Sequence, residues 1–246
     1  MKIHGIAVMK DEESRYLKSC LEWNSGFIDD LFIYDDRSSD NSVEIAEEYG
    51  VVAVRSMNEP SFMEHEGRFR QAAWESFEAT MKPSLGDFCL SFDLDEFLTL
   101  RHTSDPEAVR GVLDNITSRS GGYISQEIPF AEVFDVSASG QPFVRTDGFW
   151  GKIRASRFFA YKPDGRFADL PMGCGSVPMY VVHGSTISSS KDLTFLHYGY
   201  AVFEDRADKY DRYTSLEENG HSSQHIQSIL TKPELAKWTG PHPDLV

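Results

Sequence analysis

Short apolar runs alternate with amphipathic stretches throughout the first hundred residues, and this alternation constrains the fold more than any other feature. The apolar runs have the length of strands, and the stretches between them repeat apolar residues at helical spacing. Strands that alternate with helices form a parallel sheet covered by helices on both faces. We therefore predict an α/β fold, with strands at 3–9, 31–34, 51–54 and 88–92, helices at 13–23 and 69–81, and a helix capped by 40–42 that runs to Tyr49.

Residues 101–246 show a less regular pattern. We expect helices at 105–116 and 204–216 and strands at 123–134, 151–161, 179–182 and 193–198. Gly, Ser and Pro residues predict a turn at 137–140 and a loop at 170–178. The chain contains no linker, repeat or low-complexity segment, so we predict one domain over 1–246, with functional halves at 1–100 and 101–246.

The charge and cysteine content restrict the partners and the compartment. With 24 Lys and Arg against 39 Asp and Glu, the formal net charge is −15. A chain this acidic repels polyphosphate and anionic lipid, which argues against nucleic-acid and membrane-surface binding. Three widely spaced cysteines without a CxxC pair are typical of reduced thiols in the cytoplasm. No apolar run reaches the roughly 18 residues of a transmembrane segment, and the first run ends in charge like a strand.

Polar and acidic residues follow the predicted strands where each strand ends. Residues 10–12 follow the first strand, 35–40 the second and 93–96 the fourth. Ligands of open parallel sheets bind at the carboxyl ends of the strands. The sequence therefore predicts a binding site at this edge of the sheet.

Asp93 and Asp95 are the strongest chemical signal at that edge. Alternate carboxylates on an extended strand point in different directions, but after a turn both can face one divalent cation. Phosphate oxygens would then complete its coordination shell. The alternative is a solvated junction between strand and loop, and the pair alone does not decide between these interpretations.

The segment Asp35–Ser42 is the second signal. Part of it is typical of a helix N-cap. Capping needs one residue, however, and Asp35 and Asp36 remain at the strand end. A carboxylate there can accept hydrogen bonds from a nucleobase imide or a ribose hydroxyl.

In this order and after these strands, the motifs resemble the family 2 glycosyltransferases of the GT-A fold. The resemblance rests on Ile6–Glu12, Asp35–Ser42 and Phe92–Leu98, is close over residues 1–100 and is looser beyond them. That family has Lys-Asn-Glu after its first strand, so Asp11 is a departure. The resemblance implies a GT-A-like nucleotide-diphospho-sugar transferase fold with a mostly parallel central sheet and helices on both faces.

The resemblance also implies nucleotide contacts in the first half. Asp36, together with Asp35, would meet the base or ribose of a sugar nucleotide, and Val8 belongs to the same cofactor-binding set. Arg70 would face the base or the diphosphate, with Arg68 as the substitute candidate. The structural alternative for both arginines is an exposed position at a helix start.

By the same resemblance, Asp95 would bind the metal directly, and Asp93 would approach the ribose or reach the metal through water. The segment 193–198 resembles a strand-then-His-Tyr element of one branch of the family. This makes His197 a candidate third metal ligand, and Lys209 a candidate to neutralise the leaving diphosphate. The structural alternatives are a hydrogen-bonded strand histidine and a surface lysine.

An inverting transfer also needs a base that deprotonates the acceptor hydroxyl. The family places an acidic residue for this role beyond the DxD motif. Glu127 and Asp169 are the two catalytic candidates in this sequence.

The function implied is a metal-dependent transfer of a sugar from a UDP- or GDP-sugar to an acceptor hydroxyl, with inversion and with Mn²⁺ or Mg²⁺ as cofactor. The acceptor could be a glycan, a lipid-linked sugar or a protein. Two alternatives stay open, namely another nucleotide- or phosphate-handling α/β enzyme and a non-catalytic sugar-binding module. Residues 9–12 contain no glycine, which disfavours a nucleotidyltransferase. Both carboxylate pairs are intact, which disfavours the module.

Overall fold

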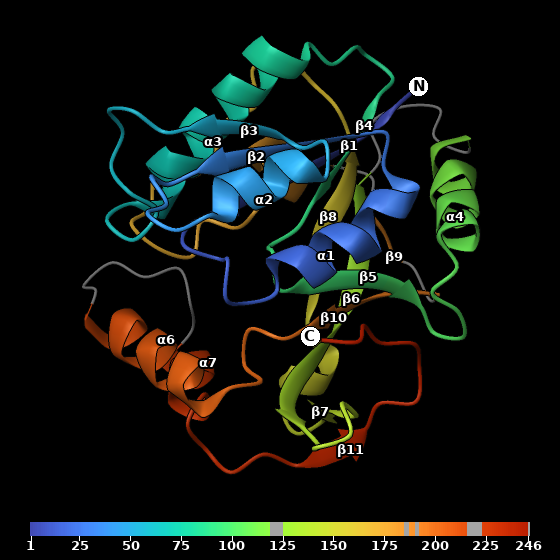
Figure 1. The fold of residues 1–246 in the computed structure, drawn as a ribbon, viewed down its shortest axis with the longest axis vertical. Coiled ribbons are helices and arrows are strands. Elements are labelled where there is room, and N and C mark those ends of the chain that lie inside the picture. The colour runs from blue at the N-terminus through green and yellow to red at the C-terminus, as the bar shows by residue number, and fades with distance from the viewer. Residues whose placement is uncertain (119–124, 185–186, 190–191, 216–222, 246) are drawn as a thin grey trace.

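The computed structural model describes residues 1–118, 125–184, 187–189, 192–215 and 223–245. It has a mixed α/β fold in which a parallel set of strands is extended by antiparallel ones (Figure 1). The predicted fold class is therefore confirmed. The predicted strand start at Tyr123 and helix end at Leu216 lie outside the described residues.

Four parallel strands form the first half of the sheet, in the order β4-β1-β2-β3. Their carboxyl ends share one edge, as expected from the strand–helix alternation of the sequence. The bounds agree with the prediction to within one or two residues: β1 (Ile3–Met9), β2 (Asp30–Asp35), β3 (Val52–Arg55) and β4 (Phe88–Ser91).

Helices cover both faces of these strands. The helices are α1 (Leu17–Asn24), α2 (Ser42–Glu48) and α3 (Glu66–Met81). Side chains of β1 alternate between the two faces. Ile3 and Ala7 pack with buried residues of α1 and α2, whereas Ile6 packs with Phe69, Trp74 and other residues of α3. The two apolar clusters fix α1 and α2 on one face and α3 on the other.

Antiparallel strands continue the sheet beyond β4. β8 (Arg154–Ala160) pairs with β4, and the long β6 (Ser125–Val136) pairs with β8. β7 (Pro142–Arg145) and β11 (Leu235–Lys237) follow in antiparallel order, and β9 (Ile187–Ser189) runs parallel to β6.

Two further strands carry residues of the candidate site. β5 (Glu96–Leu100) begins at the end of the Asp93–Glu96 segment and pairs antiparallel with β10 (Leu193–His197). β10 also pairs parallel with β6. The second half of the chain therefore places one strand end beside the acidic segment of the first half.

The other helices are α4 (Pro106–Ser118), α5 (Met179–Val182), α6 (Phe203–Ser215) and α7 (Ser223–Ser228), with 3₁₀ turns η1 (Ser25–Phe27) and η2 (Trp150–Lys152). Figure 1 shows α6 and α7 beside the lower strands, away from α1 and α2. Among the described helices, none combines the length and apolar character needed to cross a membrane.

The structure corrects several sequence expectations. Residues 179–182 form the helix α5 rather than a strand, since a four-residue apolar run suits either element. Pro178 precedes it with φ −59°, and only Val181 of the run is buried. The sequence also gave no signal for five short elements: β5, β7, β9, β11 and α7.

Candidate active site

The chain turns sharply between β4 and β5. The backbone N–H of Glu96 donates to Asp93 O at 2.9 Å, and the Glu96 carboxylate accepts from the Asp93 N–H at 3.0 Å. This turn lets Asp93 and Asp95 leave the sheet at its carboxyl edge. Their side chains nevertheless have different neighbours.

Asp93 lies between two buried arginines. Its Oδ1 is 3.3 Å from Arg70 Nη2 and its Oδ2 is 3.5 Å from Arg157 Nη2. Burial would raise the pKa of Asp93, but the two guanidinium charges outweigh it and lower the pKa. Arg70 is also held by Glu66 at 2.9 Å, and Arg157 by Glu96. Asp93 therefore belongs to an ion network whose arginines are buried while its own side chain is partly exposed.

Glu96 has the opposite electrostatic behaviour within that network. Its side chain is buried, and this burial raises its pKa to about 8 although Arg157 acts to lower it. Near neutral pH, Glu96 therefore takes up a proton that an exposed glutamate would lose.

Asp95 faces a small space beside Gly199. A Cβ atom placed on Gly199 would lie 2.4 Å from Lys209 Nζ, 2.5 Å from His197 Nε2 and 2.6 Å from Asp95 Oδ2. Three charged or polar groups thus crowd against this one position, which is too close to all of them for a side chain and which we call the space beside Gly199. Among the described residues, no hydrogen bond of normal geometry reaches the buried Asp95 Oδ1, which lies 3.4 Å from His197 Nε2.

Strand pairing and a turn produce this convergence. In the β5–β10 ladder His197 is the register partner of Glu96, which places it next to Asp95. The chain then turns, with the Tyr198 N–H donating to Asp95 O at 2.9 Å. Lys209 comes from α6, and its Nζ lies 4.4 Å from the centroid of the Tyr200 ring, a cation–π contact.

The ionisation states follow from these neighbours. Burial would raise the pKa of Asp95, but His197 and Lys209 hold it below its usual value. Burial would lower the pKa of His197, but Glu132 and Asp95 raise it well above its usual value. The space beside Gly199 is therefore bordered by the anionic carboxylate of Asp95 and by two groups that favour positive charge, Lys209 and His197.

The residues present fit a divalent cation that shares its coordination shell with a substrate. A carboxylate and a neutral imidazole are suitable donors for Mn²⁺, so His197 would release its Nε2 proton on binding the cation. Asp95 Oδ1 is a buried acceptor without a hydrogen bond in the described chain. Within the described ranges, no group of three or more His, Cys, Asp or Glu side chains forms a complete protein-only site. This agrees with cations that bind one or two carboxylates together with phosphates and water.

Glu12 and Arg15 connect this site to α6. Arg15 lies 3.7 Å from the Glu12 carboxylate and 2.9 Å from that of Asp205 on α6. Burial raises the pKa of Glu12 to about 7, although Arg15 acts to lower it. The negative charge of Asp95 also contributes to the raised pKa.

Asp35 and Asp36 are both buried at the end of β2. Asp35 accepts from the Ser38 N–H at 3.2 Å. Asp36 accepts from Arg37 at 2.9 Å and from the Phe62 N–H at 2.9 Å. These bonds order the loops at the sheet edge, and the nucleotide contacts of both residues stay predictions.

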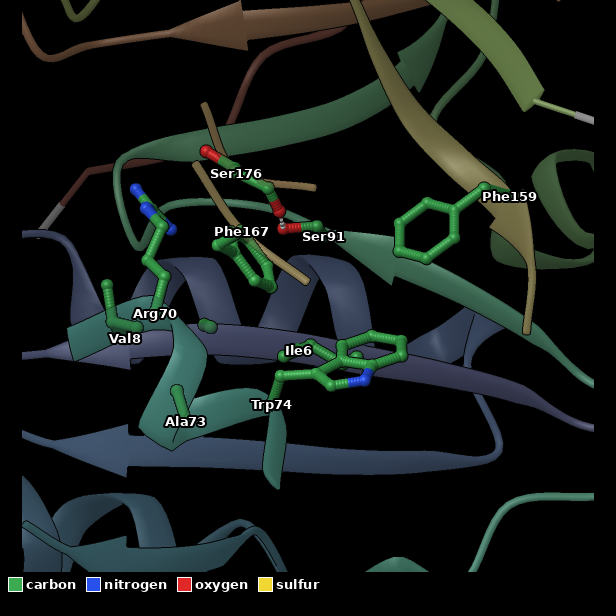
Figure 2. A pocket seen from close by; sticks show the side chains of 10 residues that line it. Ile6, Val8, Arg70, Ala73, Trp74, Ser91, Phe159, Phe167 and Ser176 are labelled. Atoms are coloured by element: carbon green, nitrogen blue, oxygen red, sulfur yellow. Dashed lines mark hydrogen bonds between the residues drawn. The ribbon is translucent and has the colours of Figure 1, made fainter. Parts of the chain in front are cut away.

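Val8 and Arg70 line one small pocket between β1 and α3 (Figure 2). Trp74 and Phe159 form its apolar part, and Ser176 closes it through a 2.6 Å bond from the Ser91 hydroxyl. Two residues predicted to bind the nucleotide therefore share a cavity wall. Their roles stay predictions.

Arg68, Asp169 and Glu127 are not among the three nearest contacts of Gly199 in the described structure. Arg68 pairs with Asp169 at 3.0 Å, and both side chains are exposed. Glu127 and Glu132 are an odd number of residues apart on β6 and point to opposite faces of the strand. It is Glu132 that contacts His197. The catalytic roles of Glu127 and Asp169 stay predictions.

Sequence reasoning missed Glu132, Arg157 and Gly199. Glu132 and Arg157 reach the site through pairing between distant strands, which leaves no local pattern. Gly199 could have been found from the sequence, because it directly follows the His197-Tyr198 pair.

The chain is similar to several solved structures. One is glucosyl-3-phosphoglycerate synthase from Mycobacterium tuberculosis in complex with Mn²⁺, UDP and glucosyl-3-phosphoglycerate, with 18% identity, 51% coverage of this chain, 43% coverage of that chain and a TM-score of 0.35. The same enzyme with Mn²⁺ and UDP-glucose gives the same values. A mycobacterial protein matches with 18% identity, 53% and 41% coverage and a TM-score of 0.37.

The match spans less than half the length of each of these solved chains. No protein-family model matches the sequence. No curated protein matches it either. Membership of glycosyltransferase family 2 therefore stays a prediction.

Proposed function

We propose that this chain is a metal-dependent glycosyltransferase that moves a sugar from a nucleotide-diphosphate donor to an acceptor hydroxyl, with inversion at the anomeric carbon. The observation that carries the proposal is the convergence of Asp95, His197 and Lys209 on the space beside Gly199. That space lies at the carboxyl edge of a parallel sheet, where such folds bind their ligands.

Asp95 and His197 are the residues that would hold the cation, which is Mn²⁺ or Mg²⁺. A cation bound there would offset the charge of the donor diphosphate and of the leaving nucleotide. Through its ion pairs with Arg70 and Arg157, Asp93 would fix the turn on which Asp95 lies. A direct or water-mediated approach of Asp93 to the ribose or metal would require it to leave one of these arginines.

Lys209 would stabilise the leaving diphosphate. Its ammonium group already borders the space beside Gly199 and is held over the Tyr200 ring. Negative charge grows on the leaving group as the glycosidic bond breaks, so this contact strengthens in the transition state. Lys209 therefore serves the chemical step more than donor binding.

The nucleotide would bind along the ends of β1 and β2. Asp36 and Asp35 would accept from the base or ribose, and Val8 and Arg70 would border the nucleotide, with Arg68 as the substitute for Arg70. For Asp36 this requires exchange of a present partner, because Arg37 and the Phe62 N–H occupy its two oxygens.

The acceptor half would comprise residues 101–246. Glu127 and Asp169 remain the proposed bases for the acceptor hydroxyl, which belongs to a glycan, a lipid-linked sugar or a protein. Asp169 would first have to separate from Arg68 and His65, which lie 3.0 and 3.3 Å away. A cytoplasmic location is supported by three buried free cysteines.

Slow hydrolysis of UDP- and GDP-sugars without acceptor tests this function. With Mn²⁺ present, we expect release of UDP or GDP from at least one sugar nucleotide, and no release in excess EDTA. Asp95→Ala is the matched control and should be inactive while remaining folded. Release of nucleotide that is equal in EDTA, or equal in the variant, would contradict the proposal.

A further inference from the structure

Glu132 forms a short, buried contact with the candidate metal ligand His197. Its Oε2 lies 2.6 Å from His197 Nδ1. The parallel pairing of β10 with β6 makes the two residues register partners, so the contact is fixed by the sheet itself. We propose that Glu132 is a positioning residue that orients the His197 ring for the cation. This inference rests on the proposed function.

The two ring nitrogens of His197 face different groups. Nδ1 faces Glu132, whereas Nε2 faces Asp95 and the space beside Gly199. A carboxylate can only accept, so Nδ1 must carry the proton in this bond. A cation would then bind at Nε2, and the proton on that nitrogen would be released to solvent. A carboxylate on the far nitrogen fixes the tautomer and increases the basicity of the nitrogen that binds the metal.

Packing around His197 supports an orienting role. The rings of Phe130 and Tyr200 contact the imidazole edge-to-face, at centroid distances of 6.0 and 5.5 Å. They restrict the tilt of the ring, but neither can choose between its two nitrogens. The negative charge of Glu132 decides which ring nitrogen carries the proton that faces it. Because Glu132 is only 3% exposed, water screens this charge little.

Glu132 acts through His197 rather than as a ligand. Its carboxylate contacts the imidazole at Nδ1, while the open space lies at Nε2. Within the described chain, no group of three or more His, Cys, Asp or Glu side chains placed to hold a metal includes Glu132. Removing its charge should therefore weaken cation binding without removing a ligand.

Calorimetric titration of the whole protein with Mn²⁺, with and without UDP, tests this inference. Glu132→Gln removes the charge, and Glu132→Ala also removes the hydrogen bond. Asp135→Asn is the matched control, because it removes one charge from an exposed position on the same strand. We expect Mn²⁺ affinity to fall about 10-fold in Glu132→Gln, up to about 100-fold in Glu132→Ala, and to stay unchanged in Asp135→Asn.

The outcomes separate this inference from the function on which it rests. If the wild type binds no Mn²⁺ in either condition, the proposed function fails. If the wild type binds Mn²⁺ and folded Glu132→Gln and Glu132→Ala bind it equally well, only the role of Glu132 is overturned.

Nitrogen NMR of the histidine-labelled wild type gives a readout that needs no Glu132 variant. His197→Gln identifies the signals of His197. We expect a protonated Nδ1 with its proton far downfield, both before and after addition of Zn²⁺ with UDP, and loss of the Nε2 proton on that addition. An Nδ1 that carries no proton would overturn the inference, even if the Glu132 variants do not fold.

Discussion

Arg157 Nη2 lies 3.5 Å from the carboxylate of Asp93, on the opposite oxygen from Arg70. Asp95, two residues later, has a buried oxygen without a hydrogen bond in the described structure. The two acids of this motif are therefore not equivalent. Asp93 is paired with two arginines, and Asp95 faces the space in which we propose the cation binds.

Asp93→Asn should reduce stability. The asparagine withdraws a counter-charge from Arg70 and Arg157, which keep Glu66 and Glu96 as ion-pair partners in the described structure. We expect the free energy of unfolding to fall by about 1.5–3 kcal/mol, the size of a hydrogen bond to a charged group. Urea unfolding measures this loss, with exposed Asp135→Asn as the control. A loss no larger than in the control would show that the two arginines do not depend on Asp93.

Lys209→Met should lower kcat more than it raises the donor KM. The methionine keeps much of the packing against Tyr200 but removes the charge beside Gly199. We expect kcat to fall about 100-fold, as for loss of one group that stabilises transition-state charge. Steady-state kinetics with the active sugar nucleotide decide this, with exposed Lys237→Met as the control. A pure KM effect would assign Lys209 to ground-state binding.

Asp36→Ala should weaken nucleotide binding and leave Mn²⁺ binding unchanged. A lost hydrogen bond to a charged acceptor is worth about 1.5–3 kcal/mol, or roughly 10- to 100-fold in affinity. Calorimetry with UDP and GDP measures the loss. The base-site assignment fails if both nucleotides bind the variant as they bind the wild type.

Glu12 should make stability depend on pH. Its pKa is raised from 4.5 to about 7, so the folded state holds the proton more tightly than the unfolded chain. The resulting stability is present below pH 4.5 and is lost as the pH rises through 7. Arg15, Lys209, Asp95 and Asp205 all act on this group.

Glu12→Gln stays neutral at every pH and isolates this effect. In EDTA, its free energy of unfolding should match that of the wild type near about pH 4 and exceed it by about 1–3 kcal/mol near about pH 8. Urea unfolding at several pH values measures the difference, with exposed Glu47→Gln as the control. A difference independent of pH would show that Glu12 titrates normally.

Local sequence patterns predicted the first half of this fold well. β1, β2 and β4 were visible as short apolar runs, and the acids that follow them marked the edge where the site lies. Periodicity could not assign Met179–Val182, because a four-residue apolar run has no period to measure.

The site itself depends on contacts between distant segments. Glu132 and His197 are 65 residues apart and meet only through the parallel pairing of β6 with β10. Arg157 reaches Glu96 across 61 residues. His197 and Lys209 were found through the family resemblance, but the role of Gly199 as the open point between them required coordinates.

We propose that a cation bound beside Gly199 holds the donor nucleotide. Calorimetric binding of UDP in Mn²⁺ and in EDTA tests it most directly, in the wild type, Asp95→Ala and Gly199→Ala. The methyl group of Gly199→Ala would lie 2.4–2.6 Å from the ends of Lys209, His197 and Asp95 and would displace them. We expect Mn²⁺-dependent UDP binding in the wild type alone. UDP binding that is equally tight in EDTA, or unchanged in both variants, would contradict it.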